Sequence, residues 1–320
     1  MTGIEADALK DNVGLAAVIW DPEVAFTATV SNPNLLLYVN DKKYDLWSIQ
    51  NLVVNGTAKN IILKEALNGN DFYCPKAFTA ESISYTHNYK METGLTDSKG
   101  WETIALPFNV QKITHSSSGE IVPFKKWNSE NETKPFWLYE LTSGGYQAAD
   151  AIKAYTPYII SMPNNSLYKK DYRISGQVTF SAENVEVGVT EQHSAKYGDR
   201  TLVPNFTNQK DESILALNVD NDIVSNMSSE NNGSKFIKGL RAVHPFEAYM
   251  TSTSGTRSID VLDGMTTTVK GIKDMIDEDQ SFKVYDIRGI FVKSGTSMKE
   301  VQQGLRTGVY VINGKKVIVK

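Results

Sequence analysis

The chain has 320 residues, with 33 lysines and arginines against 37 aspartates and glutamates, 41% hydrophobic residues and a single cysteine. This length is enough for about two domains with ordinary cores. The near balance of charge excludes a nucleic-acid binder that must neutralise many phosphates, and the apolar content excludes a disordered acidic tail. No apolar run is long enough to span a bilayer.

Residues 1–76 are expected to form a β-rich N-terminal segment. Apolar runs at 15–20 and 34–39 predict strands. The stretch 52–57 followed by 61–63 predicts a hairpin, because an Asn-Gly pair tolerates the two positive φ angles of a type I′ turn. A segment of this length is only marginally stable alone, so we expect it to pack on the next domain or to end a larger upstream region.

Residues 77–265 are predicted to form an antiparallel β-sandwich, of the jelly-roll or immunoglobulin-like type. Short segments with hydrophobic period two are separated by turn-forming clusters, which is typical of an all-β fold. In 83–91 the odd positions, including Tyr85, His87 and Tyr89, share one apolar face, which indicates a half-buried strand. Further strands are expected at 101–108, 136–142, 155–162, 172–182, 185–191, 213–219, 243–251 and 258–262.

A small C-terminal β module is predicted at 281–320, after a polar linker at 266–280. Residues 281–293 read as two strands about an Arg288-Gly289 bend, and 308–320 as a hairpin with an Asn-Gly turn. Between them, a capping box formed by Ser297 and Glu300 predicts the start of a short helix, which Gly304 can end.

Charge also sets the last 40 residues apart. They hold eight basic and two acidic residues, so the rest of the chain has a net charge of −10. Such a contrast within one chain indicates a separate basic module. Lysines on the solvated faces of a small domain would give the same pattern.

The motifs of this tail, VYDIRG at 284–289 and GVYVINGKKV at 308–317, resemble the C-terminal modules of secreted and surface proteins of the Bacteroidetes group. Upstream, 78–86, 100–108 and 245–259 resemble a recurring β-rich region of the same proteins. There it commonly follows leucine-rich repeats, immunoglobulin-like domains or a secreted peptidase.

The resemblance implies an exported protein, secreted or held on the outer cell surface. The tail is similar to the sorting domains read by the type IX (Por) secretion machinery, which would then be a partner. An immunoglobulin-like structural module is the competing interpretation. Because the first residues lack a basic region and an apolar region, the resemblance further implies that a signal peptide is missing from this sequence.

Aromatic residues crowd the stretch 124–158, and four of them are candidate ligand-binding residues: Trp127, Trp137, Tyr139 and Tyr146. Trp127 lies among polar residues, where a ring face can stack on a sugar or anchor an interface. The alternative is that the alternating aromatics fill the core between two sheets and Trp127 covers its edge.

We find no catalytic motif, no metal site and no cofactor motif in the sequence. His87 lies on an apolar strand face, where a bonded structural histidine is expected more often than a base. Cys74 follows an apolar stretch and is expected to be buried. Asn218, Asp220 and Asp222 alternate as calcium ligands can, but three oxygens are too few, and a solvated turn is favoured.

Three functions remain open from the sequence. The first is a non-catalytic secreted or cell-surface protein for adhesion, scaffolding or ligand binding, with an extracellular protein or glycan as partner. The second is a carbohydrate-binding module that uses the aromatic residues of 124–158. The third is the ancillary region of a secreted peptidase or glycosidase, which requires a cleft where two carboxylates, or a histidine and a nucleophile, converge.

Overall fold

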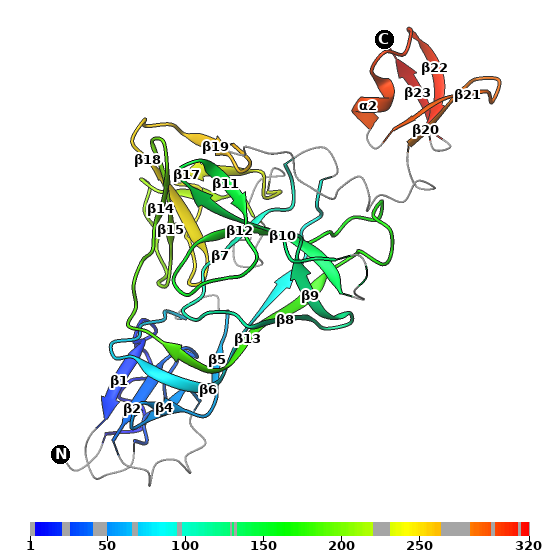
Figure 1. The fold of residues 1–320 in the computed structure, drawn as a ribbon. Coiled ribbons are helices and arrows are strands. Elements are labelled where there is room, and N and C mark those ends of the chain that lie inside the picture. The colour runs from blue at the N-terminus through cyan, green and yellow to red at the C-terminus, as the bar shows by residue number, and fades with distance from the viewer. Residues whose placement is uncertain are drawn as a thin grey trace.

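The computed structural model describes residues 4–20, 26–40, 50–65, 70–94, 98–128, 130, 133–219, 231–263, 282–295, 298–312 and 315–319. Strands account for 44% of these described residues and helix for 2%, which confirms the predicted all-β class. The strands form sheets of thirteen, six and four strands (Figure 1). In these ranges no helix has the length and apolar character needed to cross a membrane.

The large sheet begins with a parallel ladder that the sequence pattern did not predict. Its three strands are β1 (Ala17–Trp20), β2 (Leu36–Val39) and β3 (Leu52–Val54). All four side chains of β2 are buried. Leu36 and Tyr38 join the main core, whereas Leu37 and Val39 join a smaller core on the other face. Burial on both faces explains the unbroken apolar run, because strands of parallel sheets need no polar face.

The predicted Asn-Gly turn is present, but it joins different strands from those expected. Asn55 and Gly56 have φ angles of 49° and 80°, and they connect β3 to the two-residue strand β4 (Thr57–Ala58). The second expected arm, β5 (Ile61–Leu63), instead pairs in parallel with β6 (Phe78–Tyr89), as does β4. The sheet therefore continues across residue 76 without a break.

Two buried asparagines fix the chain at the bends of the ladder. The side-chain oxygen of Asn34 accepts a hydrogen bond from the Lys64 N–H at 2.7 Å, and its amide donates to the Lys64 carbonyl at 2.9 Å. Asn51 binds Ile62 in the same way, accepting from its N–H at 2.8 Å. Buried backbone groups at the bends thus find side-chain partners, and the segment that leads to Glu65 is held in place.

The longest pairing in the sheet joins β6 to β13 (Gly176–Val187), antiparallel from one end to the other. On the other side of β13 lie β8 (Lys112–His115) and then β9 (Gly119–Pro123). The sheet then continues through β10 (Lys134–Thr142), β12 (Tyr158–Ser161) and β7 (Glu102–Ile104), with β11 (Gly145–Ala148) paired to β10. The sequence predicted two strands here, at 172–182 and 185–191, whereas the structure has the single strand β13.

Strand β10 lies between two cores. Phe136 and Leu138 belong to the main core, together with residues of β6 and β13. Trp137 and Tyr139 belong to a second core, together with residues of the six-stranded sheet. This position explains why four consecutive large apolar residues occur in one strand, since both of its faces are covered.

The six-stranded sheet is antiparallel throughout and covers the second core. In spatial order it consists of β14 (Ala195–Tyr197), β15 (Arg200–Pro204), β18 (Ala248–Ser252), β16 (Leu215–Leu217), β17 (Lys235–Lys238) and β19 (Ser258–Asp260). In Figure 1 these are the yellow-green and yellow strands beside β10 to β12. A packed pair of sheets thus exists within 77–265, while the parallel ladder extends the fold beyond it.

The C-terminal module forms a sheet of its own around Val284, Val301 and Ile312. Its elements are β20 (Phe282–Asp286), β21 (Phe291–Gly295), α2 (Met298–Gln302), β22 (Gly308–Ile312) and β23 (Lys315–Val319). The predicted bend, short helix and terminal hairpin are all confirmed, with Gly289 and Gly304 at φ angles of 81° and 78°. The expected linker at 266–280 and Ser297 of the capping box lie outside the described residues.

Candidate functional site

Three of the four candidate ligand-binding aromatics lie inside the protein. Trp137, Tyr139 and Tyr146 are buried in the second core, between β10 and the six-stranded sheet. Their rings cannot stack on a surface sugar, so the structure corrects their assignment to a ligand site. These three residues instead fill a core between two sheets, which was the alternative interpretation of the aromatic stretch.

Trp127 differs because its ring is partly exposed. Phe124 and Tyr172 contact the ring edge to face, both with centroids 5.9 Å away. The indole N–H donates to the Thr133 carbonyl at 3.0 Å. Aromatic neighbours and one hydrogen bond therefore fix the orientation of Trp127, and Phe124 and Tyr172 are also partly exposed beside it.

The most concentrated group of titratable residues lies elsewhere, around His87 on β6. The Nδ1 atom of His87 bonds to the carboxylate of Glu65, which follows β5. Its Nε2 atom lies 2.5 Å from the carboxylate of Glu102, the first residue of β7. Three separate segments of the chain thus meet in one ion triad.

Neighbouring groups determine the charges of the triad. Burial opposes a charged imidazole, but the carboxylates of Glu102 and Glu65 outweigh it and raise the pKa of His87 well above 6.5. Burial likewise disfavours ionised Glu65, yet His87 and a 2.6 Å hydrogen bond from the Tyr85 hydroxyl lower its pKa. The ring of Tyr89 packs against His87, with centroids 4.4 Å apart. At neutral pH the triad therefore holds an imidazolium between two carboxylates.

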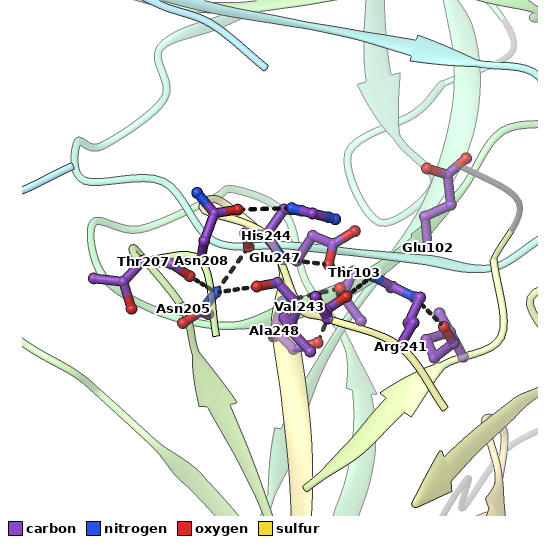
Figure 2. Close-up of polar contacts among 12 residues, drawn as sticks. Glu102, Thr103, Asn205, Thr207, Asn208, Arg241, Val243, His244, Glu247 and Ala248 are labelled. Carbon is purple, nitrogen blue, oxygen red and sulfur yellow. Dashed lines mark hydrogen bonds and ion pairs between the residues drawn. The ribbon is translucent and has the colours of Figure 1, made fainter. Parts of the chain in front are cut away.

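A second polar network adjoins the triad, on the loop before β18. Arg241 donates to the Glu247 carboxylate at 2.7 Å, and the same oxygen accepts from the His244 backbone N–H at 3.0 Å (Figure 2). The amide of Asn205 donates to the Val243 and His244 carbonyls. These bonds hold the loop in one conformation.

The residue His244 is only 8% exposed, and the two nitrogens of its ring have different environments. Nδ1 lies 2.8 Å from the side-chain oxygen of Asn208, whose orientation is fixed because its amide donates to Asn70 and Asp71. Nδ1 therefore carries the proton. Nε2 is a buried acceptor with no protein partner. Burial lowers the pKa of His244, so the ring is neutral at pH 7.

A small cavity connects the triad to His244. It has a volume of about 60 Å³ and is lined by residues that include Glu65, His87, Glu102 and His244. Figure 2 shows Nε2 of His244 turned away from Asn208, toward the side on which Glu102 lies. Ligand pockets measure roughly 300 Å³ or more. The cavity can hold a few water molecules, which would satisfy Nε2, but it cannot hold a sugar ring or a peptide.

Chemically, the triad supplies an ion pair and offers no free base. The two carboxylates that a glycosidase requires do converge here, but on opposite nitrogens of a single imidazole. Among the described residues, no group of three or more metal-binding side chains is placed to hold an ion. The buried thiol of Cys74 has a raised pKa and remains protonated, in line with the predicted buried side chain.

The alternating oxygens at 218–222 are described only in part. The Asn218 oxygen accepts from the N–H groups of Ser234 and Lys235, both at 2.8 Å. Asp220 and Asp222 lie outside the described residues. Asn218 is buried and connects the backbone after β16 to the backbone at the start of β17, so it does not lie in the solvated turn that was favoured.

Sequence reasoning placed His87 on its strand face but did not find its partners. Glu65, Glu102 and His244 stand in unrelated segments without a recognisable spacing, and only the pairing of β5 with β6 brings the first of them close. The apolar face of 83–91 was the one available signal, because a histidine buried on such a face needs polar partners.

Comparisons with known proteins return no match for this chain. No protein-family model matches it, no curated protein matches it, and no solved structure matches it.

Proposed function

We propose that this chain is a non-catalytic secreted or cell-surface protein that acts in adhesion or as a scaffold. The observation that supports this most directly is the bonding of His87, whose two nitrogens are both taken by carboxylates. An imidazole bonded in this way ties β5, β6 and β7 together and has no nitrogen left for acid-base chemistry. Its neighbours on the same strand, Tyr85 and Tyr89, belong to the main core.

Binding and turnover assays test this proposal. The full chain is applied to immobilised extracellular-matrix proteins and glycans, and is separately incubated with general peptidase and glycosidase substrates. We expect binding without turnover, and we expect Glu102→Gln to leave binding unchanged at temperatures where that variant is folded. Turnover that disappears in Glu102→Gln would instead identify the triad as a catalytic site.

For localisation, we propose export with 282–319 as a sorting-type module. The support is that this module has its own sheet and its own core, as a separately folded module does. The test is expression, behind a signal peptide, in a bacterium that carries the type IX machinery. The full chain should reach the cell surface or the medium, and a chain that ends at residue 263 should stay in the periplasm. Equal export of both would contradict the proposal.

A second candidate function, carbohydrate binding, is favoured by one observation at Trp127. Its partly exposed ring lies beside those of Phe124 and Tyr172, which together form a fixed aromatic surface. A glycan array with the wild type and Trp127→Ala tests it. Tyr73→Ala is the matched control, since Tyr73 is an exposed aromatic elsewhere on the chain. Sugar binding that only Trp127→Ala abolishes supports this function, and absence of binding by the wild type contradicts it.

A further inference from the structure

The large apolar side chains exposed on this protein are concentrated in the C-terminal module. Of the ten found in the described part of the chain, six belong to 282–319. Four of these six surround the turn between β20 and β21: Ile287, Ile290, Phe291 and Val292, with exposures of 73%, 55%, 54% and 42%. Single exposed apolar residues are normal on a protein surface, but a cluster of this kind marks an interaction site.

This cluster, which we call the apolar tip, lies on a tight and well-formed turn. One oxygen of Asp286 accepts from the backbone N–H groups of Arg288 and Ile290, at 2.8 and 3.0 Å. Gly289 supplies the positive φ angle that the turn needs. In Figure 1 the turn is the orange loop at the outer edge of the module. Its apolar side chains are therefore presented by a rigid backbone.

The apolar tip belongs to a strongly basic module. Residues 281–320 hold eight basic and two acidic side chains. The guanidinium of Arg288 lies on the tip itself and is largely exposed, bonded to Asp286 at 2.8 Å. A surface that meets the tip must accept apolar side chains and also carry negative charge.

From these observations we propose that the apolar tip inserts into the interface of an anionic lipid bilayer, with Arg288 facing the lipid phosphates. Ile287 lies in the turn itself and Ile290 and Phe291 follow it, so the apolar side chains gather at the end of the β20–β21 hairpin. A bilayer surrounds such a tip on all sides, whereas a flat protein surface would cover one side of it. A second copy of the module is disfavoured because it carries the same positive charge. This inference does not depend on the proposed secretion route.

Vesicle co-sedimentation of the full chain tests the proposal. We expect binding to phosphatidylglycerol vesicles, little binding to phosphatidylcholine vesicles, and a decrease in binding as salt is added. The double variant Ile287→Ser with Ile290→Ser should bind at least about tenfold more weakly, since each exposed isoleucine buried in lipid contributes substantially. Both side chains point to solvent, so the variant should keep the wild-type thermal unfolding curve.

Ile318→Ser is the matched control, because Ile318 is an exposed isoleucine of the same module on β23, away from the tip. It should bind vesicles like the wild type. The proposal is overturned if phosphatidylglycerol vesicles do not bind the chain, or if the double variant binds as well as Ile318→Ser. It is also overturned if the double variant changes the sedimentation coefficient without vesicles, because the tip would then contact a second copy or the rest of its own chain.

Discussion

Glu65 and Glu102 bind opposite nitrogens of one imidazole, so two carboxylates from separate strands are held together by His87. Without the positive ring, two negative carboxylates would lie close together with no counter-charge between them. We therefore regard His87 as the residue that joins β5 and β7 to the long strand β6.

Replacing His87 by Gln should destabilise the fold. The change leaves two partly buried carboxylates without a counter-charge, which costs about 2 kcal/mol or more even after allowing for the partial exposure of Glu65. Urea unfolding of His193→Gln provides the control. The His193 side chain bonds Glu191 and both side chains are exposed, so the loss of this ion pair should lower the free energy of unfolding by less than about 0.5 kcal/mol. Equal destabilisation of the two variants would show that the triad does not tie the strands together.

Stability should fall as pH rises above neutrality, because of the same histidine. The folded state raises the pKa of His87 above 6.5, so it binds this proton more tightly than the unfolded chain does. The stabilisation is complete below pH 6.5 and is lost as pH rises toward the folded-state pKa. Urea midpoints from about pH 6 to about pH 9 should decline more steeply for the wild type than for His87→Gln. Parallel declines would assign the effect to other groups.

Gly233 should not tolerate a side chain. Its φ angle is 65°, and a Cβ atom there would lie 2.1 Å from the carbonyl oxygen of Trp101. Gly198 has a φ angle of 59° but open space around it. We expect Gly233→Ala to lower the free energy of unfolding by about 3 kcal/mol or more, and Gly198→Ala to lower it by only about 1 kcal/mol. Thermal unfolding of both variants separates the cost of the backbone angle from the cost of the close contact.

Trp137→Ala should be far more destabilising than Trp127→Ala. The ring of Trp137 is fully buried between two sheets, so its removal leaves a large cavity that costs about 3–5 kcal/mol. Trp127 is partly exposed, so Trp127→Ala should lower the free energy of unfolding by about 1–2 kcal/mol. Chemical unfolding of both variants gives the comparison, and similar losses would place Trp127 in the core as well.

Local patterns in the sequence predicted individual strands well. The alternation in 83–91 corresponds to the buried and exposed faces of β6, and the paired turn signals of the C-terminal module correspond to its bend and hairpin. Where the prediction divided β13 into two strands, Asn184 adopts a φ angle of 49° within a continuous strand. A single distorted residue interrupts the hydrophobic pattern without ending the strand.

The sequence pattern did not predict which strands pair with one another. Ile61–Leu63 follows an Asn-Gly turn that predicts a hairpin, yet it pairs in parallel with β6, where Ile61 and Leu63 are buried. The triad depends on that pairing, because it brings Glu65 beside His87. A site assembled from single residues of separate strands leaves no periodic signal in the sequence.

The pairing of β6 with β13 also constrains how the chain reaches its native state. The innermost pair of this ladder joins Tyr89 to Gly176, so β7 to β12 all lie between its two strands in sequence. The chain between β6 and β13 must fold or form a long loop before these two strands can pair, which makes folding slow. During synthesis β6 emerges long before its partner, and its twelve residues remain an open edge until β13 arrives.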